Sequence, residues 1–513
     1  MHDQRSVAGD PSPSSRLRMA LASLTTLTHR GYTPRVSSHS TVAARAERAL
    51  VFAAAGGLIL LGVAFAPGLD MFRAPKEAAM RAQAIISVFA LAVAIVYGGT
   101  SRIRQLLRER GVIAILGGAV LWSIITTLTS QQRILSIQAL VTILCSAILF
   151  VAVWYVARDV PVAALLVLVP IVVVNTLLAA LQEFSIWNPF DFRAAELQTA
   201  HLRASALIGN PNDVGGYLAI CAVVLFGASE FLRGRLRWIA AIGAFAALAG
   251  VIVSQSRTAV ITVAAAAAFI GVRRSWKTAL VVTLLVIALL VVATRIDLPA
   301  FTRVARIPEQ LMRGDWDVLF SDRLPAFVAA YGMFRDHPFL GVGPGAYKYL
   351  YMSYRIHLSE IYSARLMRGA GVNFAEAHND HLQLLAETGL PGYALFVAAC
   401  VVIALRVRRK GESDDERAQF AAQLAIPFVI TVAVLALAFF PLQIAATRHL
   451  LVTMSALILG WGAAPHPALR ATLSPQTPRA PRRAGILPAS RGRAGRPLSS
   501  ATGEPDEGQR RTR

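Results

Sequence analysis

Residues 135–157 are LSIQALVTILCSAILFVAVWYVA, a run of apolar and small polar residues without Asp, Glu, Lys or Arg. A run of about 20 such residues is long enough to cross a bilayer as a helix. Similar runs recur along the 513-residue chain, which is 55% hydrophobic and only 16% charged. Soluble chains carry about a quarter charged residues, so a soluble enzyme, a secreted disulfide scaffold and a disordered protein are all disfavoured. The sequence predicts an all-α polytopic membrane protein.

Twelve apolar runs, most of them without a charged residue, predict twelve transmembrane helices, with ends defined to within a few residues. The first starts near Ala49, which is too late, and is too long, for a cleavable signal peptide, so it is expected to remain in the mature chain. Cys145, Cys221 and Cys400 all lie inside the runs and form no disulfide or zinc pattern. The runs are 49–66, 80–99, 112–129, 135–157, 161–182, 213–232, 238–255, 258–272, 278–294, 390–405, 422–440 and 446–463.

The net charge of +22 is concentrated on one side of this topology. Residues 1–48 hold seven Arg against three acidic residues, and residues 464–513 hold ten Arg against three. Both tails have too little apolar surface to fold and are expected to be disordered. Short basic loops after the second, sixth, eighth and tenth runs lie on the same side as both tails, which the positive-inside rule makes the cytoplasm. Solvated basic tails usually contact lipid head groups, so no nucleic-acid partner is expected.

One long segment breaks this alternation. Residues 295–389 carry ten Lys and Arg against ten Asp and Glu, and they are too many for a connector. They are expected to form a small, mainly helical domain on the outside of the membrane, between the ninth and tenth helices. The predicted domains are a basic tail (1–48), helices one to nine (49–294), the outer domain (295–389), helices ten to twelve (390–463) and a second basic tail (464–513).

The outer domain begins with two recognisable local signals. A helix is predicted from Ser321-Asp322-Arg323 to about Arg335, with Ser321 or Asp322 capping its first turn. The run Gly341-Val342-Gly343-Pro344-Gly345 follows, but it lacks the Lys-Ser/Thr of a phosphate-binding loop. A structural turn is therefore favoured over a nucleotide site.

A third signal is His378-Asn379-Asp380, where Asn379 or Asp380 starts a short helix. His378 is interpreted either as a surface cap residue or as a general base that takes a proton from a sugar hydroxyl. A zinc site of His378, His381 and Asp380 is disfavoured, because neither HExxH nor a cysteine ligand is present. No metal and no other cofactor is expected.

Arginines near the outer ends of two predicted helices are ambiguous by themselves. Arg257 opens the eighth run, where it either extends to the lipid head groups or grips a diphosphate with its planar fork. Arg203 precedes the polar turn 209–213, whose default role is to cap the sixth run.

These signals, taken together, resemble the O-antigen ligase and polymerase superfamily between about residues 50 and 463. The resemblance is carried by Gly209-Asn210-Pro211-Asn212, by Ser256-Arg257-Thr258-Ala259, by Arg323 with Asp336-His337-Pro338-Phe339-Leu340-Gly341-Val342-Gly343-Pro344-Gly345, and by His378-Asn379-Asp380 with Glu387 and Gly389. It implies a metal-independent, inverting glycosyltransferase of the bacterial inner membrane, with a fold like that of lipid-dependent membrane glycosyltransferases. Such an enzyme moves a glycan from undecaprenyl diphosphate to an acceptor, such as lipid A–core, on the periplasmic side. Both termini would be cytoplasmic.

The resemblance also implies roles for individual residues. His378 would be the base that activates the acceptor hydroxyl, and Arg257 and Arg323 would hold the diphosphate. His381 and His337 are alternative bases. The other expected substrate-binding residues are Arg203, Asn379, Asp380 and Glu387.

Several functions remain open within and beyond this superfamily. A ligase, a polymerase of O-antigen or exopolysaccharide, and a protein O-oligosaccharyltransferase use the same donor and the same residues. A polysaccharide transporter without catalysis is disfavoured, because internal repeats and ionisable residues in the middle of the runs are not evident. The sequence does not identify the sugar, the acceptor or the oligomeric state.

Overall fold

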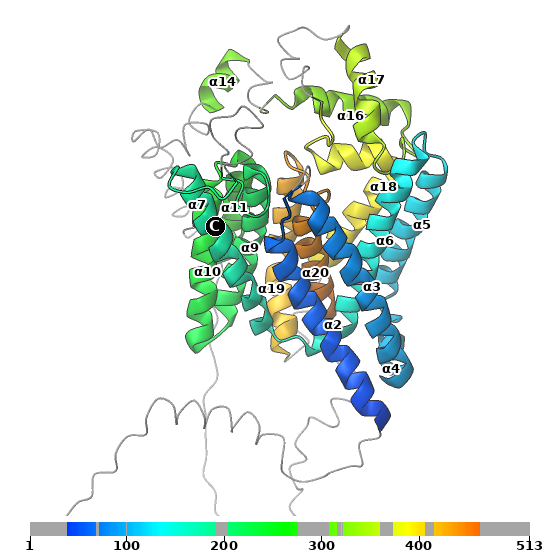
Figure 1. Ribbon diagram of the computed structural model, residues 1–513, viewed down its shortest axis with the longest axis vertical. Coiled ribbons are helices and arrows are strands. Elements are labelled where there is room, and N and C mark those ends of the chain that lie inside the picture. The colour runs from blue at the N-terminus through cyan, green and yellow to red at the C-terminus, as the bar shows by residue number, and fades with distance from the viewer. Residues whose placement is uncertain are drawn as a thin grey trace, which may run out of the picture. The chain divides into compact units, whose positions relative to one another are not determined.

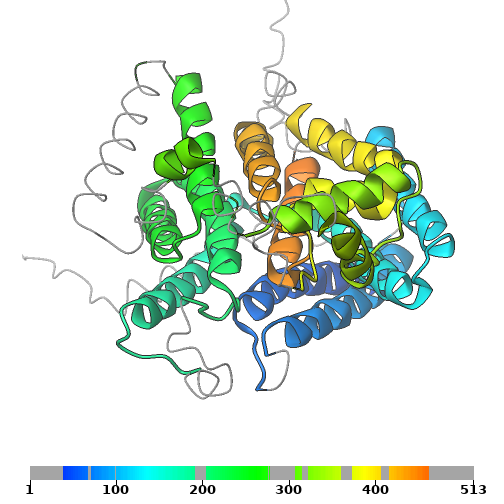
Figure 2. The same cartoon turned by 90° about the horizontal axis from the view of Figure 1, so that it is seen from above.

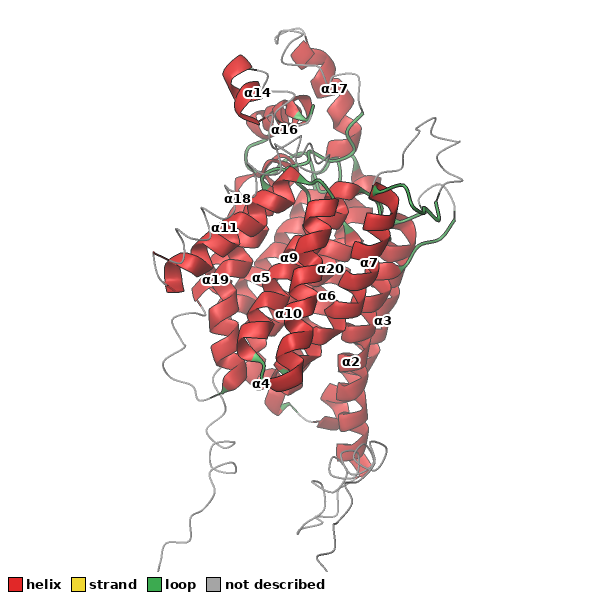
Figure 3. Ribbon diagram, turned by 90° about the vertical axis from the view of Figure 1, so that its left-hand side faces the viewer, coloured by secondary structure: helices red, strands yellow, loops and turns green. Residues whose placement is uncertain are grey.

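The computed structural model describes residues 38–67, 71–98, 100–190, 204–274, 277, 307–314, 320, 322–359, 373–405 and 415–461. These residues form helices and no strand (Figure 3). The helices are α2 (Ser38–Val63), α3 (Arg73–Gly98), α4 (Ser101–Leu106), α5 (Arg110–Leu128), α6 (Arg133–Val156), η1 (Ala157–Asp159), η2 (Val162–Val167), α7 (Leu168–Glu183), α9 (Pro211–Phe231), α10 (Gly234–Val253), α11 (Arg257–Arg274), α14 (Ile307–Arg313), α16 (Leu324–Asp336), α17 (Tyr347–Ser359), α18 (Asp380–Ala404), α19 (Glu416–Ala436) and α20 (Ala445–Trp461).

Nine helices of the described residues are long and apolar enough to cross a membrane. They involve α2, α3, α5, α6, η2 with α7, α9, α10, α18 and α19. The eighth and twelfth predicted runs coincide with α11 and α20, but α11 includes three arginines and α20 has only 17 residues. The ninth run, 278–294, lies outside the described residues. The all-α membrane protein is thus confirmed, and the number twelve stays a prediction.

Two helices differ most from their predicted bounds. The first, α2, begins at Ser38 rather than near residue 49, because the residues before the apolar run continue its helix. The helix that carries the tenth run begins at Asp380, with Asn379 as its N-cap, and it is broken at Gly389 (φ 66°, ψ −173°). A Cβ at Gly389 would lie 2.1 Å from the carbonyl oxygen of Phe339, so only glycine allows this approach.

The bundle is organised around α9, which is buried along most of its length. It packs against α7, α10, α11, α19 and α20. Small residues allow these close contacts: a Cβ on Gly215 would lie 2.5 Å from Ser254 Oγ, and one on Gly216 would lie 2.6 Å from the Phe439 ring. The start of α9 is capped as expected, since Asn210 Oδ1 accepts a hydrogen bond from the Asn212 N–H (2.9 Å).

A second, smaller core joins α16, α17 and the first part of α18. Its fully buried members include Ala326, Met333, Tyr347 and Tyr351. In Figure 1, α14, α16 and α17 lie at one end of the bundle, which we call the loop end, and Figure 2 looks down on this end. This core belongs to the part of the predicted outer domain that the structure describes.

The segment Gly341–Gly345 connects α16 to α17 and is a structural turn, as predicted. Gly341, Gly343 and Gly345 all have positive φ. Its backbone pairs with α18, because the N–H of Gly343 donates to the Glu387 carbonyl (3.0 Å), and a Cβ on Gly343 would meet Ser130 Oγ at 2.1 Å. The predicted cap of α16 by Asp322 is wrong: Arg323 is the N-cap residue and makes no side-chain capping bond, while Ser321 lies outside the described residues.

Candidate active site

Several helices begin at the loop end, and their first residues carry the polar groups of the site. Arg73 begins α3, Asp213 lies in the first turn of α9, Arg257 begins α11, Arg323 precedes α16 and His378 precedes α18. Helix N-termini present unpaired N–H groups and positive dipole ends, so this arrangement favours an anion.

Residues 438–442, which we call the 438–442 loop, connect α19 to α20 and join these helix ends. The carbonyl of Ala438 accepts hydrogen bonds from Arg323 Nη1 (2.8 Å) and from the hydroxyl of Thr258 (3.4 Å). The N–H of Leu442 donates to Asp380 Oδ2 (2.8 Å). One loop therefore fixes the starts of α11, α16 and α18 relative to one another.

His378 is half-buried between two aromatic rings, with a backbone φ of 54°. Its imidazole meets Phe440 edge to face (centroids 4.5 Å apart, 82°) and Phe374 in the same way (5.5 Å, 86°). Its Nδ1 is buried without a hydrogen-bond partner among the described residues. The interpretation of His378 as a surface cap is wrong, because Asn379 caps α18.

The surroundings of His378 keep its imidazole in the neutral form. Burial lowers its pKa, and the positive charges of Arg323 and Arg73 lower it further, to about 3. The imidazole is therefore neutral at physiological pH and able to accept a proton.

Arg323 and Arg257 both lie at the loop end, as the sequence predicts. Arg323 is half-buried; burial lowers its pKa, and the Asp213 carboxylate raises it. Arg257 is half-buried as well, and its Nη1 lies 3.5 Å from Gln310 Oε1 of α14. Thr258, next to Arg257, shares the Ala438 carbonyl with Arg323, so the same loop contacts the start of α11 and Arg323 before α16.

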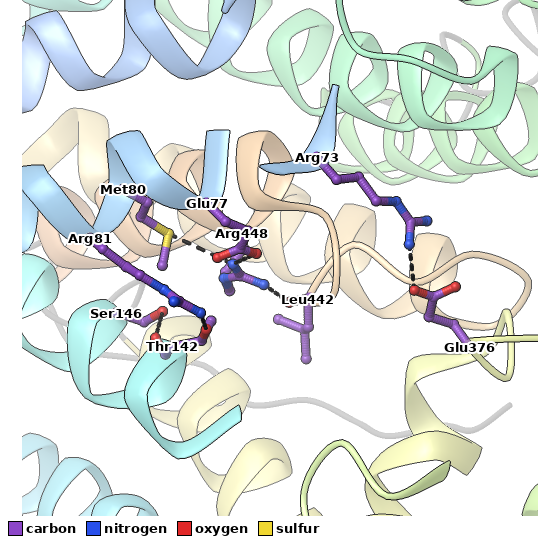
Figure 4. Close-up of polar contacts among 9 residues, drawn as sticks. All are labelled: Arg73, Glu77, Met80, Arg81, Thr142, Ser146, Glu376, Leu442 and Arg448. Atoms are coloured by element: carbon purple, nitrogen blue, oxygen red, sulfur yellow. Dashed lines mark hydrogen bonds and ion pairs between the residues drawn. The ribbon is translucent and has the colours of Figure 1, made fainter. Parts of the chain in front are cut away.

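Arg73 is a site residue that sequence reasoning missed. Its Nη1 forms an ion pair with Glu376 Oε1 (2.6 Å), two residues before His378 (Figure 4). Its guanidinium carbon also lies 5.7 Å from the centroid of the Phe440 ring. A signal was present, because Arg73 falls on the outer side of the predicted topology, where the positive-inside rule does not expect basic residues.

The remaining predicted binding residues bond mainly to the protein itself. Asn379 Oδ1 accepts from the Leu382 N–H (3.0 Å), and Asp380 holds Leu442. Glu387 is buried, accepts from Gln383 Nε2 (3.2 Å) and takes backbone N–H groups at the start of α17. Arg203 lies outside the described residues. That these four residues contact substrate stays a prediction.

The alternative histidines lie elsewhere. His381 belongs to the first turn of α18, and its side chain extends towards α19. Its Nδ1 lies 3.2 Å from the Tyr393 hydroxyl and its Nε2 lies 3.0 Å from the Ala433 carbonyl oxygen. His337 Nε2 lies 3.3 Å from Gln131 Nε2, at the turn between α5 and α6. His378, His381 and Asp380 thus do not converge. Within the described ranges, no group of three His, Cys, Asp or Glu side chains is arranged to hold a metal ion.

An ion pair between α3 and α20 supports the 438–442 loop. Arg448 is buried and pairs with Glu77, and its Nη1 donates to the Leu442 carbonyl (3.0 Å; Figure 4). The backbone of Leu442 is therefore held on both sides, because its N–H donates to Asp380 and its carbonyl accepts from Arg448. Arg448 lies near the start of the twelfth predicted run, and the sequence reasoning did not single it out.

An apolar cavity of about 390 Å³ lies among α5, α6, α18, α19 and α20. It reaches the 438–442 loop at Leu442, two residues from the Phe440 ring that contacts His378. An apolar chain fits such a cavity better than a sugar does. Its lining includes Trp122, Phe150, Leu384, Phe396, Phe428 and Leu442.

Comparison with known families agrees with this geometry. Residues 242–397 match the family described as O-antigen ligase. The matched segment includes Arg257, Arg323 and His378. No curated protein matches the chain. The expected resemblance to the O-antigen ligase and polymerase superfamily is thus confirmed over residues 242–397 of the chain.

Proposed function

We propose that this protein is an inverting glycosyltransferase that moves a glycan from undecaprenyl diphosphate to an acceptor hydroxyl, with lipid A–core as the acceptor. The observation that carries the proposal is the position of His378, whose Nδ1 is buried without a hydrogen-bond partner among the described residues, against the same loop that binds Arg323 at one end of a membrane helix bundle. A proton acceptor and fixed positive charges are the two groups that glycosyl transfer from a diphosphate needs.

In the proposed reaction, His378 removes the proton from the acceptor hydroxyl as its oxygen attacks the anomeric carbon. The bond between that carbon and the diphosphate oxygen breaks, and the diphosphate leaves with the bonding electrons. Arg257 and Arg323 offset the negative charge that develops on it, so the step requires no metal ion. A single in-line displacement inverts the anomeric configuration.

The position of the site suits a lipid-linked donor. The apolar cavity between α5, α6, α18, α19 and α20 reaches the 438–442 loop, which also contacts His378 and Arg323. A hydrocarbon chain within the bundle would thus place its polar head group near the base. We assign this cavity to part of the undecaprenyl chain.

We propose the bacterial inner membrane as the location, with the loop end in the periplasm and both termini in the cytoplasm. The positive-inside rule supports this orientation. Single cysteines introduced at Ser353, near the middle of α17, and at Arg108, after α4, test it with a membrane-impermeant reagent. Labelling of the cysteine at 353 alone is expected, and labelling of the cysteine at 108 alone would reverse the topology.

Reconstitution tests the activity. Purified protein in nanodiscs receives undecaprenyl-diphosphate-linked glycan together with lipid A–core, and products are separated by mass. Transfer to lipid A–core is expected. Glycan extended on its own carrier would instead identify a polymerase, and the absence of any new glycosidic bond with all acceptors would overturn the proposed function.

The roles of the arginines are tested by a conservative change. Arg257→Lys keeps the positive charge but loses the planar fork that binds phosphate with two hydrogen bonds, so turnover is expected to fall. Arg313→Lys, at the exposed end of α14, is the matched control and should retain full turnover. Full turnover in Arg257→Lys at normal protein abundance would remove the diphosphate role from Arg257.

A further inference from the structure

Arg73 lies in the site without an assigned role. Its side chain is 43% exposed and its partner Glu376 is 17% exposed, and the pair joins residues 303 positions apart in the sequence. The arginine side of this pair is open to water, which screens its attraction for the carboxylate. An incoming anion can therefore replace Glu376 on Arg73 at little energetic cost.

Other charges near Arg73 differ in this respect. Lys76 is buried, and its Nζ donates to the carbonyl oxygens of Ala64, Phe72 (3.2 Å) and Leu207 (2.7 Å). Asp213 is buried and interacts electrostatically with Arg73 and Arg323. Both groups are fixed inside the protein, whereas the pair of Arg73 and Glu376 reaches water.

The Phe440 ring links Arg73 to the base. The guanidinium carbon of Arg73 lies 5.7 Å from the ring centroid, and the imidazole of His378 lies 4.5 Å from it. An anion on Arg73 would therefore lie beside His378, where the sugar–phosphate bond must be placed for transfer.

We propose that Arg73 binds an anion and changes its partner on donor binding. Without donor it pairs with Glu376, and when the lipid-linked donor binds it pairs with the diphosphate instead. The inference rests on the proposed function, because undecaprenyl diphosphate is its donor. The guanidinium of Arg73 exchanges the Glu376 carboxylate for a phosphate of the donor. Glu376 therefore neutralises the positive charge of Arg73 before binding, and the donor phosphate neutralises it afterwards.

Binding of undecaprenyl diphosphate to the full-length protein in nanodiscs tests the exchange. Arg73→Gln should weaken binding by roughly 10- to 100-fold, the loss of one charge-assisted hydrogen-bonding group. Glu376→Gln should tighten binding by up to roughly fivefold, because the competing carboxylate is gone. In the double variant the Glu376→Gln gain should vanish, since Glu376 acts through Arg73.

Matched controls separate exchange from general charge effects. Arg81→Gln removes an exposed charge from the same helix, where Arg81 Nη2 donates to the Thr142 hydroxyl (3.4 Å; Figure 4). Asp336→Asn removes an exposed carboxylate of α16. Both should bind as wild type does. Arg73→Lys, which keeps the charge, serves where Arg73→Gln accumulates poorly, and it should show intermediate binding.

Two results would overturn the exchange. One is a Glu376→Gln gain of equal size with and without Arg73, which would make Glu376 a general repulsive charge. The other is wild-type binding by both Arg73 variants. If the wild-type protein still transfers glycan, either result leaves the proposed function standing. Failure of the wild-type protein to bind undecaprenyl diphosphate would instead overturn the proposed function itself.

Discussion

Lowering the pH from 7 to 5 is expected to leave the rate of glycan transfer at saturating donor nearly unchanged. Burial and the charges of Arg323 and Arg73 lower the pKa of His378 to about 3. At pH 5 such an imidazole is still about 99% neutral, whereas one with an ordinary pKa of ~6.5 would be only about 3% neutral. The ordinary value would therefore reduce the rate by about 25-fold between pH 7 and pH 5.

The assay is single-turnover transfer in nanodiscs, followed across pH 4 to 8. A depressed pKa means that the neutral imidazole is lost only as pH falls towards about 3, so the acid limb of the wild-type protein should lie below this range. Arg323→Gln removes a positive neighbour, raises the pKa of His378 and should move the acid limb to higher pH. A fall of about 25-fold from pH 7 to pH 5 in the wild-type protein would refute the reasoning.

Three further predictions follow from the site and its supports. EDTA should leave transfer intact because arginines offset the diphosphate charge, and rescue of an inhibited enzyme by a divalent ion would contradict this. Gly343→Ala should lower stability by about 1–3 kcal/mol in thermal unfolding, because its Cβ would meet Ser130 Oγ, while Gly117→Ala, with open space around it, serves as control. Arg448→Met should cost about 3–5 kcal/mol by leaving Glu77 unpaired, and adding Glu77→Gln should recover part of the loss; equal unfolding temperatures for wild type and Arg448→Met would contradict the support of the 438–442 loop.

Much of the fold follows from patterns that are local in sequence. A bilayer-length apolar run specifies a helix whatever its neighbours are, so eleven of the twelve predicted runs coincide with described helices. Cap positions such as Asn210 and Asn379 followed from the same kind of local chemistry. The break at Gly389 has a local cause too, because Gly389 and the nearby Pro391 interrupt a helix.

The site was less predictable, because it is assembled from distant segments. The roles of Arg257, Arg323 and His378 came from a family resemblance and not from their spacing. Arg73 was missed because its partner Glu376 lies 303 residues away. The 438–442 loop was missed because it acts through the backbone groups of Ala438 and Leu442, for which the sequence carries no side-chain signal.

The most direct test of the central claim compares wild type with His378→Ala in donor binding and in single-turnover transfer, using the same nanodisc preparation. Loss of a general base should slow transfer by roughly 100- to 10,000-fold and leave the affinity for undecaprenyl-diphosphate-linked glycan nearly unchanged. Transfer by His378→Ala at the wild-type rate and normal abundance would contradict the account.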